Sequence, residues 1–217
     1  MSRPYDLLIF DWDGTLADST GQIVRSMQIA IAELGWEPRS DQQVGELIGL
    51  GLKDGLGKLY PESDAQALME LLGVFRQQWL TLGTGSAEAP LFSGAAATLS
   101  ALHDAGYTLA IATGKSRKGL DRSLTWHRPI RGLFSATRTA DETADKPHPR
   151  MLEELLAECG LPPQRALMIG DTSYDAEMAA ALGMTCLGVA TGVHDADRIR
   201  RAGAVTVVGS VSDLPAW

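Results

Sequence analysis

Two aspartates separated by one residue follow the first apolar run of the chain. Asp11 and Asp13 lie in the segment DWDGTLADS, directly after residues 7–10, whose apolar run is typical of a buried strand. Two carboxylates this close repel each other unless a cation or a shared proton compensates. Gly14 allows a sharp turn after the pair. The pattern favours a cation site or an acid–base pair, with a simple acidic turn as the alternative. Gln22 stands where an EF-hand loop needs glutamate, which argues against that type of calcium site.

A second acidic pair follows another apolar run, residues 166–169. Asp171 and Asp175 lie in the segment GDTSYDAEMA, where a helix is expected to begin. The alternative roles are helix capping for Asp171 and interaction with the helix dipole for Asp175. Because the carboxyl ends of parallel strands meet at one edge of a sheet, we expect Asp171 to lie near Asp11 and Asp13. Such an oxygen-only cluster suits Mg²⁺.

A candidate anion site follows the apolar run 107–112. The segment ATGKS places the hydroxyl of Thr113 and then Gly114 before a predicted helix, whose first N–H groups can bind phosphate. A helix cap is the alternative role of Thr113. A Walker A loop is excluded, because Leu109 occupies the position of its first glycine.

Lys146 precedes the segment PHP, in which two prolines restrict the chain before a predicted helix. A lysine is a compact positive charge with three donors, suited to a phosphate oxygen and a nearby carboxylate. An ordinary surface lysine is the alternative. The four segments together therefore predict a site for a cation and a phosphate.

The elements that must position these residues alternate along the second half of the chain. Apolar runs predict strands at residues 7–10, 107–112, 166–169, 184–189 and 204–208. Helical patterns lie at residues 94–105, 115–126, 149–159, 174–182 and 195–202. Strands that are apolar on both faces and alternate with helices predict an α/β fold, a Rossmann-like three-layer core with a parallel sheet.

The first half of the chain departs from this alternation. Apolar residues at helical spacing predict three helices within residues 17–87, and this segment contains no strand signal. The run GTGSAE, residues 83–88, indicates a linker. We therefore expect a core domain of residues 1–16 and 88–217 and an inserted all-helical cap domain of residues 17–87, with hinges near residues 17–19 and 83–87.

Composition limits the classes of protein and partner. The 217 residues carry a net charge of -8, which argues against a nucleic-acid partner, and two cysteines are too few for a disulfide scaffold. No signal peptide is apparent, and the longest uncharged stretch, residues 178–193, is too short to span a membrane. We expect a cytoplasmic protein with no membrane partner, and the oligomeric state is left open.

The four segments DWDGTLADS, ATGK, KPHPRML and GDTSYDAEMA, in this order, resemble the four motifs of the haloacid dehalogenase superfamily. The resemblance is closest to phosphoglycolate-phosphatase-like phosphatases with a small helical cap, and it covers nearly the whole chain. One departure is Gly114, where close relatives often have asparagine.

The resemblance implies a Mg²⁺-dependent hydrolase of a small phosphorylated metabolite. Asp11 would be the nucleophile that forms an aspartyl-phosphate, and Asp13 would protonate the leaving alcohol and then help to activate water. Asp171 would bind Mg²⁺ together with Asp11 and the backbone carbonyl of Asp13.

The same resemblance implies roles for the remaining motif residues. Thr113 and the Gly114 amide would hold the phosphoryl group, which Lys146 would neutralise while positioning the nucleophile. Asp175 would support Lys146 or a metal-bound water. In the cap, Arg25 and Lys53 are candidate specificity residues, with Lys53 in the loop predicted over residues 47–56.

Two other functions remain open at this stage. A sugar phosphomutase of the same superfamily uses the same acid pair, although the segment 17–82 contains no histidine. A catalytically silent regulatory or binding protein would be expected to lack Asp11 or Asp13. Asp13 also argues against dehalogenation, which requires no acid for the leaving group.

Overall fold

Six parallel strands form one sheet in the order β3-β2-β1-β4-β5-β6. The protein is represented by a computed structural model, which describes residues 3–82 and 88–216. The strands are β1 (Leu7–Phe10), β2 (Thr108–Thr113), β3 (Phe134–Thr139), β4 (Ala166–Gly170), β5 (Thr185–Val189) and β6 (Thr206–Val208). Phe10, the last residue of β1, pairs with Ile111 of β2 and Ile169 of β4. The carboxyl ends of these three strands therefore lie side by side.

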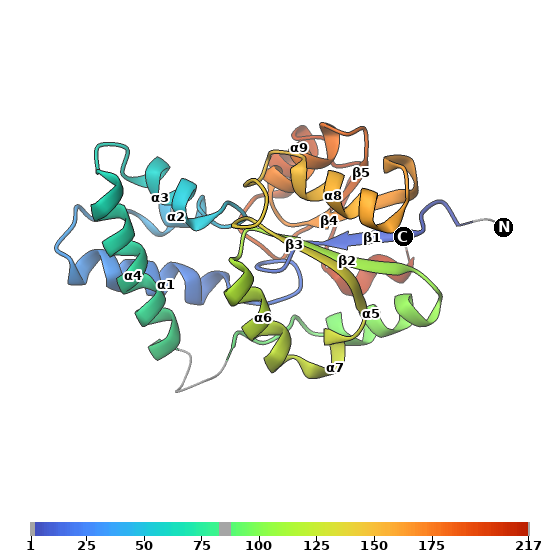
Figure 1. Cartoon of the computed structure of the whole chain (residues 1–217), viewed down its shortest axis with the longest axis horizontal. Coiled ribbons are helices and arrows are strands. Elements are labelled where there is room, and N and C mark those ends of the chain that lie inside the picture. The colour runs from blue at the N-terminus through green and yellow to red at the C-terminus, as the bar shows by residue number, and fades with distance from the viewer. Residues whose placement is uncertain (1–2, 83–87, 217) are drawn as a thin grey trace.

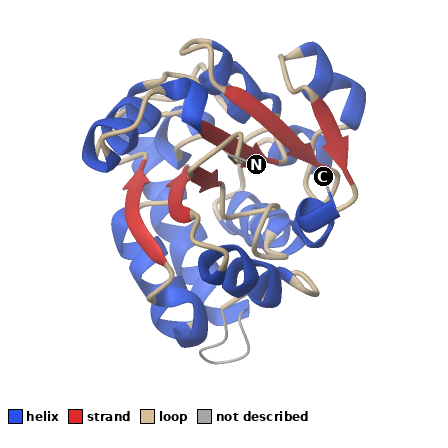
Figure 2. Cartoon of the chain, turned by 90° about the vertical axis from the view of Figure 1, so that its right-hand side faces the viewer, coloured by secondary structure: helices blue, strands red, loops and turns tan. Residues whose placement is uncertain are grey.

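Helices cover both faces of the sheet, which confirms the three-layer prediction (Figure 1). They are α5 (Ala95–Asp104), α6 (Arg117–Trp126), α7 (Arg128–Arg131), α8 (Arg150–Cys159), α9 (Ser173–Ala180) and α10 (Ala196–Arg201), with the short 3₁₀ helices η1 (Pro163–Arg165) and η2 (Val211–Ala216). Alternate residues of β1 face opposite layers: Leu7 and Ile9 pack with α8 and α9, whereas Leu8 and Phe10 pack with α5 and α6. Figure 2 shows the strands enclosed by helices.

Between β1 and α5, helices joined by loops are the main elements of the described residues, with isolated bridges from Ala17 to Asp13 and Leu91. It contains α1 (Thr20–Glu33), α2 (Asp41–Gly45), α3 (Leu52–Leu59) and α4 (Ala65–Leu82). These helices pack around a hydrophobic cluster of their own, centred on residues such as Met27, Leu56 and Phe75. They form a separate lobe beside the sheet (Figure 1). The predicted hinge at residues 83–87 lies outside the described residues.

The two chain segments that join this lobe to the core run beside each other. Asp18 N donates a hydrogen bond to Pro90 O at 2.8 Å, and Phe92 N donates to Leu16 O at 2.9 Å. No helix in the described residues is long and apolar enough to cross a membrane.

Among the described residues, the short helices α7, η1 and η2 and two larger elements were not predicted from the sequence. The first is β3, whose sequence FSATRT carries four polar residues at the edge of the sheet. The second is α3, which begins at Leu52 inside the predicted loop 47–56 despite its two glycines. Burial of Leu56 and Leu59 against the other helices outweighs the low helix propensity of glycine.

Candidate active site

The candidate residues converge at the carboxyl ends of the three central strands. Asp11 follows β1, Thr113 ends β2 and Asp171 follows β4. All three side chains are buried, with exposed fractions of 0–1%. The parallel register of β1 with both neighbours therefore brings together residues that are far apart in the sequence.

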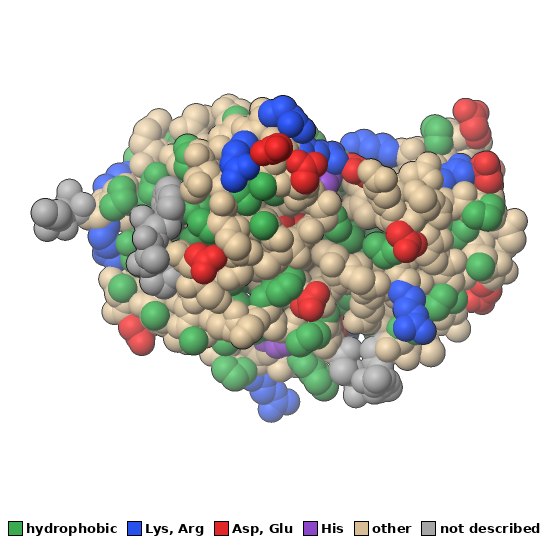
Figure 3. Space-filling model, turned by 180° about the vertical axis from the view of Figure 1, so that it is seen from behind, with side chains coloured by type: hydrophobic (Ala, Val, Ile, Leu, Met, Phe, Trp, Pro, Cys, Tyr) green, Lys and Arg blue, Asp and Glu red, His purple; other side chains and the backbone are tan. Residues whose placement is uncertain are grey.

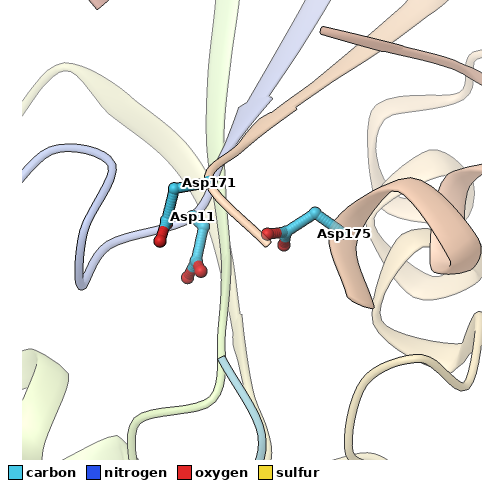
Figure 4. A group of neighbouring side chains, drawn as sticks. All are labelled: Asp11, Asp171 and Asp175. Atoms are coloured by element: carbon cyan, nitrogen blue, oxygen red, sulfur yellow. The ribbon is translucent and has the colours of Figure 1, made fainter. Parts of the chain in front are cut away.

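Three carboxylates form a cluster that could hold a metal ion. Asp11, Asp171 and Asp175 each offer an oxygen, and these oxygens lie within 4.8 Å of one another. Figure 4 shows Asp175 reaching from α9 towards Asp11 and Asp171. Asp11 Oδ2 and Asp171 Oδ2 are buried and accept no hydrogen bond. Asp11 Oδ2 is ion-paired with Lys146, whereas Asp171 Oδ2 has no such partner. A buried carboxylate oxygen without a partner, close to two other carboxylates, fits a hard cation such as Mg²⁺.

Glycines make room for the Asp171 carboxylate. A Cβ atom at Gly14 would lie 2.4 Å from Asp171 Oδ2, and one at Gly192 would lie 1.6 Å from the same atom. Gly14 also has φ of +82°, which disfavours any residue with a side chain. Thr15 Oγ1 donates a hydrogen bond to Asp171 Oδ1 at 2.7 Å. The segment after β1 therefore positions both Asp11 and the Asp171 carboxylate.

Lys146 lies fully buried between two of the carboxylates. Its Nζ is 3.0 Å from Asp11 Oδ2 and 2.6 Å from Asp175 Oδ1. The second oxygen of Asp175 accepts hydrogen bonds from Thr172 N at 3.1 Å and Thr172 Oγ1 at 2.7 Å. Asp175 thus completes the capping box at the start of α9 and pairs with Lys146 at the same time.

Burial and charge shift the pKa values of these groups. Burial raises the pKa of Asp11 from 3.8 to about 7, although the charge of Lys146 opposes the shift. Burial, and next the charge of Asp11, raise the pKa of Asp171 well above its ordinary value. Burial lowers the pKa of Lys146, but the charges of Asp11 and Asp175 outweigh it and raise the pKa above the ordinary value. Lys146 is therefore a permanent positive charge inside the site.

Asp13 stands apart from the carboxylate cluster. Its Oδ1 accepts hydrogen bonds from Ser19 Oγ at 2.6 Å and Lys115 Nζ at 2.9 Å. The side chain of Ser19 makes no cap hydrogen bond at the start of α1. Sequence reasoning missed both partners, because the position of Ser19 suggests a helix cap and Lys115 resembles a solvated helix residue.

Thr113 and Gly114 meet the helical lobe directly. A Cβ atom at Gly114 would lie 2.5 Å from the carbonyl oxygen of Leu50 and 2.8 Å from that of Gly49. The departure from asparagine noted in the sequence thus coincides with close approach of the loop between α2 and α3. Thr113 Oγ1 accepts a hydrogen bond from Lys115 N at 3.2 Å.

A cavity of about 330 Å³ separates this site from the helical lobe. Its lining includes Asp11, Asp13 and Thr113 from the core and residues of α1, α2 and α4 from the lobe. Arg25 is exposed and does not line the cavity. Lys53 is also exposed and lines a different cavity. Their roles in specificity remain predictions.

The surface carries charges of both signs. On the face shown in Figure 3, acidic and basic side chains are scattered among one another. Glu46 of the lobe pairs with Arg198 of the core at 2.7 Å. This face offers no broad basic surface for a polyanion.

Several known proteins are similar to this chain in sequence and in architecture. The haloacid dehalogenase-like hydrolase family matches residues 8–189. The chain is 31% identical to the probable phosphatase IndB of Dickeya dadantii, covering 96% of this chain and 91% of that protein. It is 29% identical to a phosphoglycolate phosphatase of Aliivibrio fischeri, covering 92% and 90%. A crystal structure of a hydrolase from Pseudomonas syringae superposes with a TM-score of 0.86 at 25% identity, covering 96% and 95%.

Proposed function

This chain belongs to the haloacid dehalogenase-like hydrolase family, and on that premise we propose that it is a Mg²⁺-dependent phosphatase of a small phosphorylated metabolite. The observation that carries the proposal is the ion pair between Lys146 and Asp11, next to Asp171 Oδ2, which is buried and accepts no hydrogen bond. A nucleophilic carboxylate repels an anionic ester, so cations must be in place before attack. Relatives named phosphatase support the same reaction class.

In the first step, a carboxylate oxygen of Asp11 attacks phosphorus and forms an aspartyl-phosphate. The bond from phosphorus to the alcohol oxygen breaks, and the alcohol takes a proton from Asp13. Thr113 Oγ1 and the Gly114 N–H would donate hydrogen bonds to the phosphoryl oxygens, while Lys146 balances their charge. Ser19 and Lys115 hold the Asp13 carboxyl in place for the transfer.

In the second step, water attacks the phosphorus of the aspartyl-phosphate. Asp13, now a carboxylate, accepts the proton of that water, and the bond between phosphorus and Asp11 breaks to release phosphate. Such acid–base help is typically worth about 10²–10⁴-fold in rate. Asp13 would therefore act in both steps.

Asp11 and Asp171 would hold the Mg²⁺, with the Asp13 backbone carbonyl as a further ligand. Asp11, Asp171 and Asp175 with the single cation Lys146 leave a formal excess of negative charge that a divalent cation would offset. When bound, Mg²⁺ supplies a positive charge that stabilises the phosphoryl group during transfer. Asp175 would support Lys146.

We further propose that residues 17–87 act as a cap domain over a core of residues 1–16 and 88–217. The separate hydrophobic cluster of the four helices and the adjacent connections at Asp18–Pro90 and Leu16–Phe92 support this division. The proposed setting is the cytoplasm, with a small metabolite as substrate rather than a nucleic acid or a membrane.

Phosphate release from a panel of phosphate monoesters with Mg²⁺ tests the function. We expect turnover of at least one member, and loss of turnover when Mg²⁺ is removed with a chelator. Parallel reactions with a sugar monophosphate and a bisphosphate primer test the mutase, which would interconvert isomers without releasing phosphate. If no member reacts under either condition, the hydrolase proposal fails and a silent binding protein becomes the better description.

Thermal unfolding at different pH values tests the metal site independently of activity. Because burial raises the folded pKa of Asp11 from 3.8 to about 7, the metal-free folded state binds more protons than the unfolded state between these values. Its stability should therefore fall as pH rises from about 4 to 7. Mg²⁺ at 100 times its dissociation constant should add about 2.7 kcal/mol, or about 5–10 °C in Tm, at pH 8 and less at pH 5.

Asp171→Asn is the variant for this measurement, and Asp104→Asn, at an exposed position on α5, is its control. We expect the Mg²⁺-dependent shift to shrink only in Asp171→Asn. An equal shift in both variants would place the ion elsewhere.

A further inference from the structure

The cavity above the candidate site has two chemically different sides. The core side contains Asp11, Asp13 and Thr113, whereas the lobe side is formed mainly by apolar residues such as Met27, Val44, Ile48, Phe75 and Trp79. Its volume of about 330 Å³ lies at the lower end of the range for small-molecule sites. A phosphoryl group held at Thr113 would therefore leave the rest of the ester facing an apolar wall.

Trp79 marks where the leaving alcohol would lie. The Lys115 ammonium is 5.2 Å from the centre of the indole ring and 2.9 Å from Asp13 Oδ1. The same lysine therefore links the indole to the carboxyl proposed to protonate the alcohol. Trp79 and Phe75 are only 7% and 5% exposed, so packing in the lobe holds both rings in place.

Few charged residues of the cavity come from this wall. Among the described residues that line the cavity, Arg76 is the only cation from the lobe, and it is exposed. On the core side, Lys115 is paired with Asp13, Arg122 is paired with Glu88, and Lys118 is exposed. A carboxylate packed against the apolar residues of the wall would lose hydration, whereas an apolar ring would bury surface.

We propose that the substrate is a phosphate monoester whose alcohol carries a planar unsaturated ring, which packs against Phe75 and Trp79. This inference rests on the proposed phosphatase function and narrows its substrate class. The ring could belong to an aryl alcohol or to a nucleoside, since both present the same flat apolar face. Small hydrophilic esters such as phosphoglycolate would be poorer substrates, because they leave the wall in contact with water.

Steady-state kinetics on three esters tests the proposal: 1-naphthyl phosphate, uridine 5′-monophosphate and phosphoglycolate. We expect kcat/KM for at least one ring ester to exceed that for phosphoglycolate by about 10-fold or more. Comparison of kcat/KM for 1-naphthyl phosphate and uridine 5′-monophosphate shows whether the alcohol of the preferred ester is an aryl alcohol or a nucleoside. A preference for phosphoglycolate over both ring esters would overturn the inference while leaving the phosphatase intact, whereas no phosphate from any ester would overturn the phosphatase as well.

Variants at Trp79 separate contact with the ring from general stability. Trp79→Leu should lower kcat/KM for the preferred ring ester about 10-fold and leave that for phosphoglycolate within about 3-fold, and Trp79→Phe should restore most of the loss. Trp126→Leu, at a half-exposed position outside the cavity lining, is the matched control. Equal losses for all esters in folded Trp79→Leu, verified by its melting temperature, would refute the contact.

Discussion

Asp11→Asn is expected to lower phosphate release by at least about 10³-fold while the protein stays folded. An amide does not form the acyl-phosphate that a carboxylate oxygen forms, so both steps of the proposed reaction are lost. The same change removes a charge that is costly in the metal-free site, because burial raises the pKa of Asp11 to about 7. At pH 8 without Mg²⁺, the variant should therefore melt at the same temperature as the parent or higher.

Phosphate release and thermal unfolding of Asp11→Asn, the parent and Asp104→Asn check this result. Asp104 is an exposed aspartate whose change should alter neither quantity. If Asp11→Asn kept the turnover of the parent, Asp11 would not be the nucleophile. Lost turnover together with a collapsed melting temperature would instead identify a structural role.

Asp11, Thr113 and Asp171 could be located from the sequence because each lies at the carboxyl end of a strand. Apolar runs before Asp11, Thr113 and Asp171 identify central strands, and parallel strands bring such ends together. Phe134–Thr139 escaped prediction because an edge strand is half-solvated and its polar residues lack a distinctive pattern. Strands with a continuous apolar run, including the edge strand β6, were thus predictable, whereas the polar edge strand β3 was not.

Contacts between distant segments were beyond the sequence. Ser19 and Lys115 reach Asp13 from the segments before α1 and α6, which are far apart in the sequence. Similarly, only the structure explains the glycine at position 114. A larger residue there would clash with the carbonyl oxygen of Leu50. These contacts depend on the tertiary arrangement of the core and the helical lobe. The spacing of residues within one segment does not predict that arrangement.

The specificity residues show the same limitation. Arg25 and Lys53 stood out because charged groups suggest binding, yet neither lines the cavity above Asp11. The helical spacing of Phe75 and Trp79 instead predicts ordinary packing residues. They belong to the hydrophobic cluster of the lobe and also line the cavity, so one stripe of α4 serves both purposes.

Lys146→Met should combine a large loss of turnover with a large loss of stability. The substitution keeps an unbranched side chain but leaves Asp11 and Asp175 buried without their shared cation. Removing one partner of a buried ion pair typically costs about 3–5 kcal/mol. For a chain of this size that corresponds to a fall of about 6–20 °C in Tm. Turnover should fall by at least about 10³-fold, because the nucleophile loses its partner and the phosphoryl group loses a positive charge.

A double variant separates the loss of the charge from the loss of packing. Asp175→Asn in the Lys146→Met background removes one of the two unpaired carboxylates, so it should recover part of the melting temperature but none of the activity. Lys53→Met, at an exposed lysine, should change Tm by no more than about 1 °C. Turnover at the parental rate in folded Lys146→Met would show that Asp11 needs no lysine. An unchanged melting temperature in that variant would show that the two carboxylates are compensated by something other than Lys146.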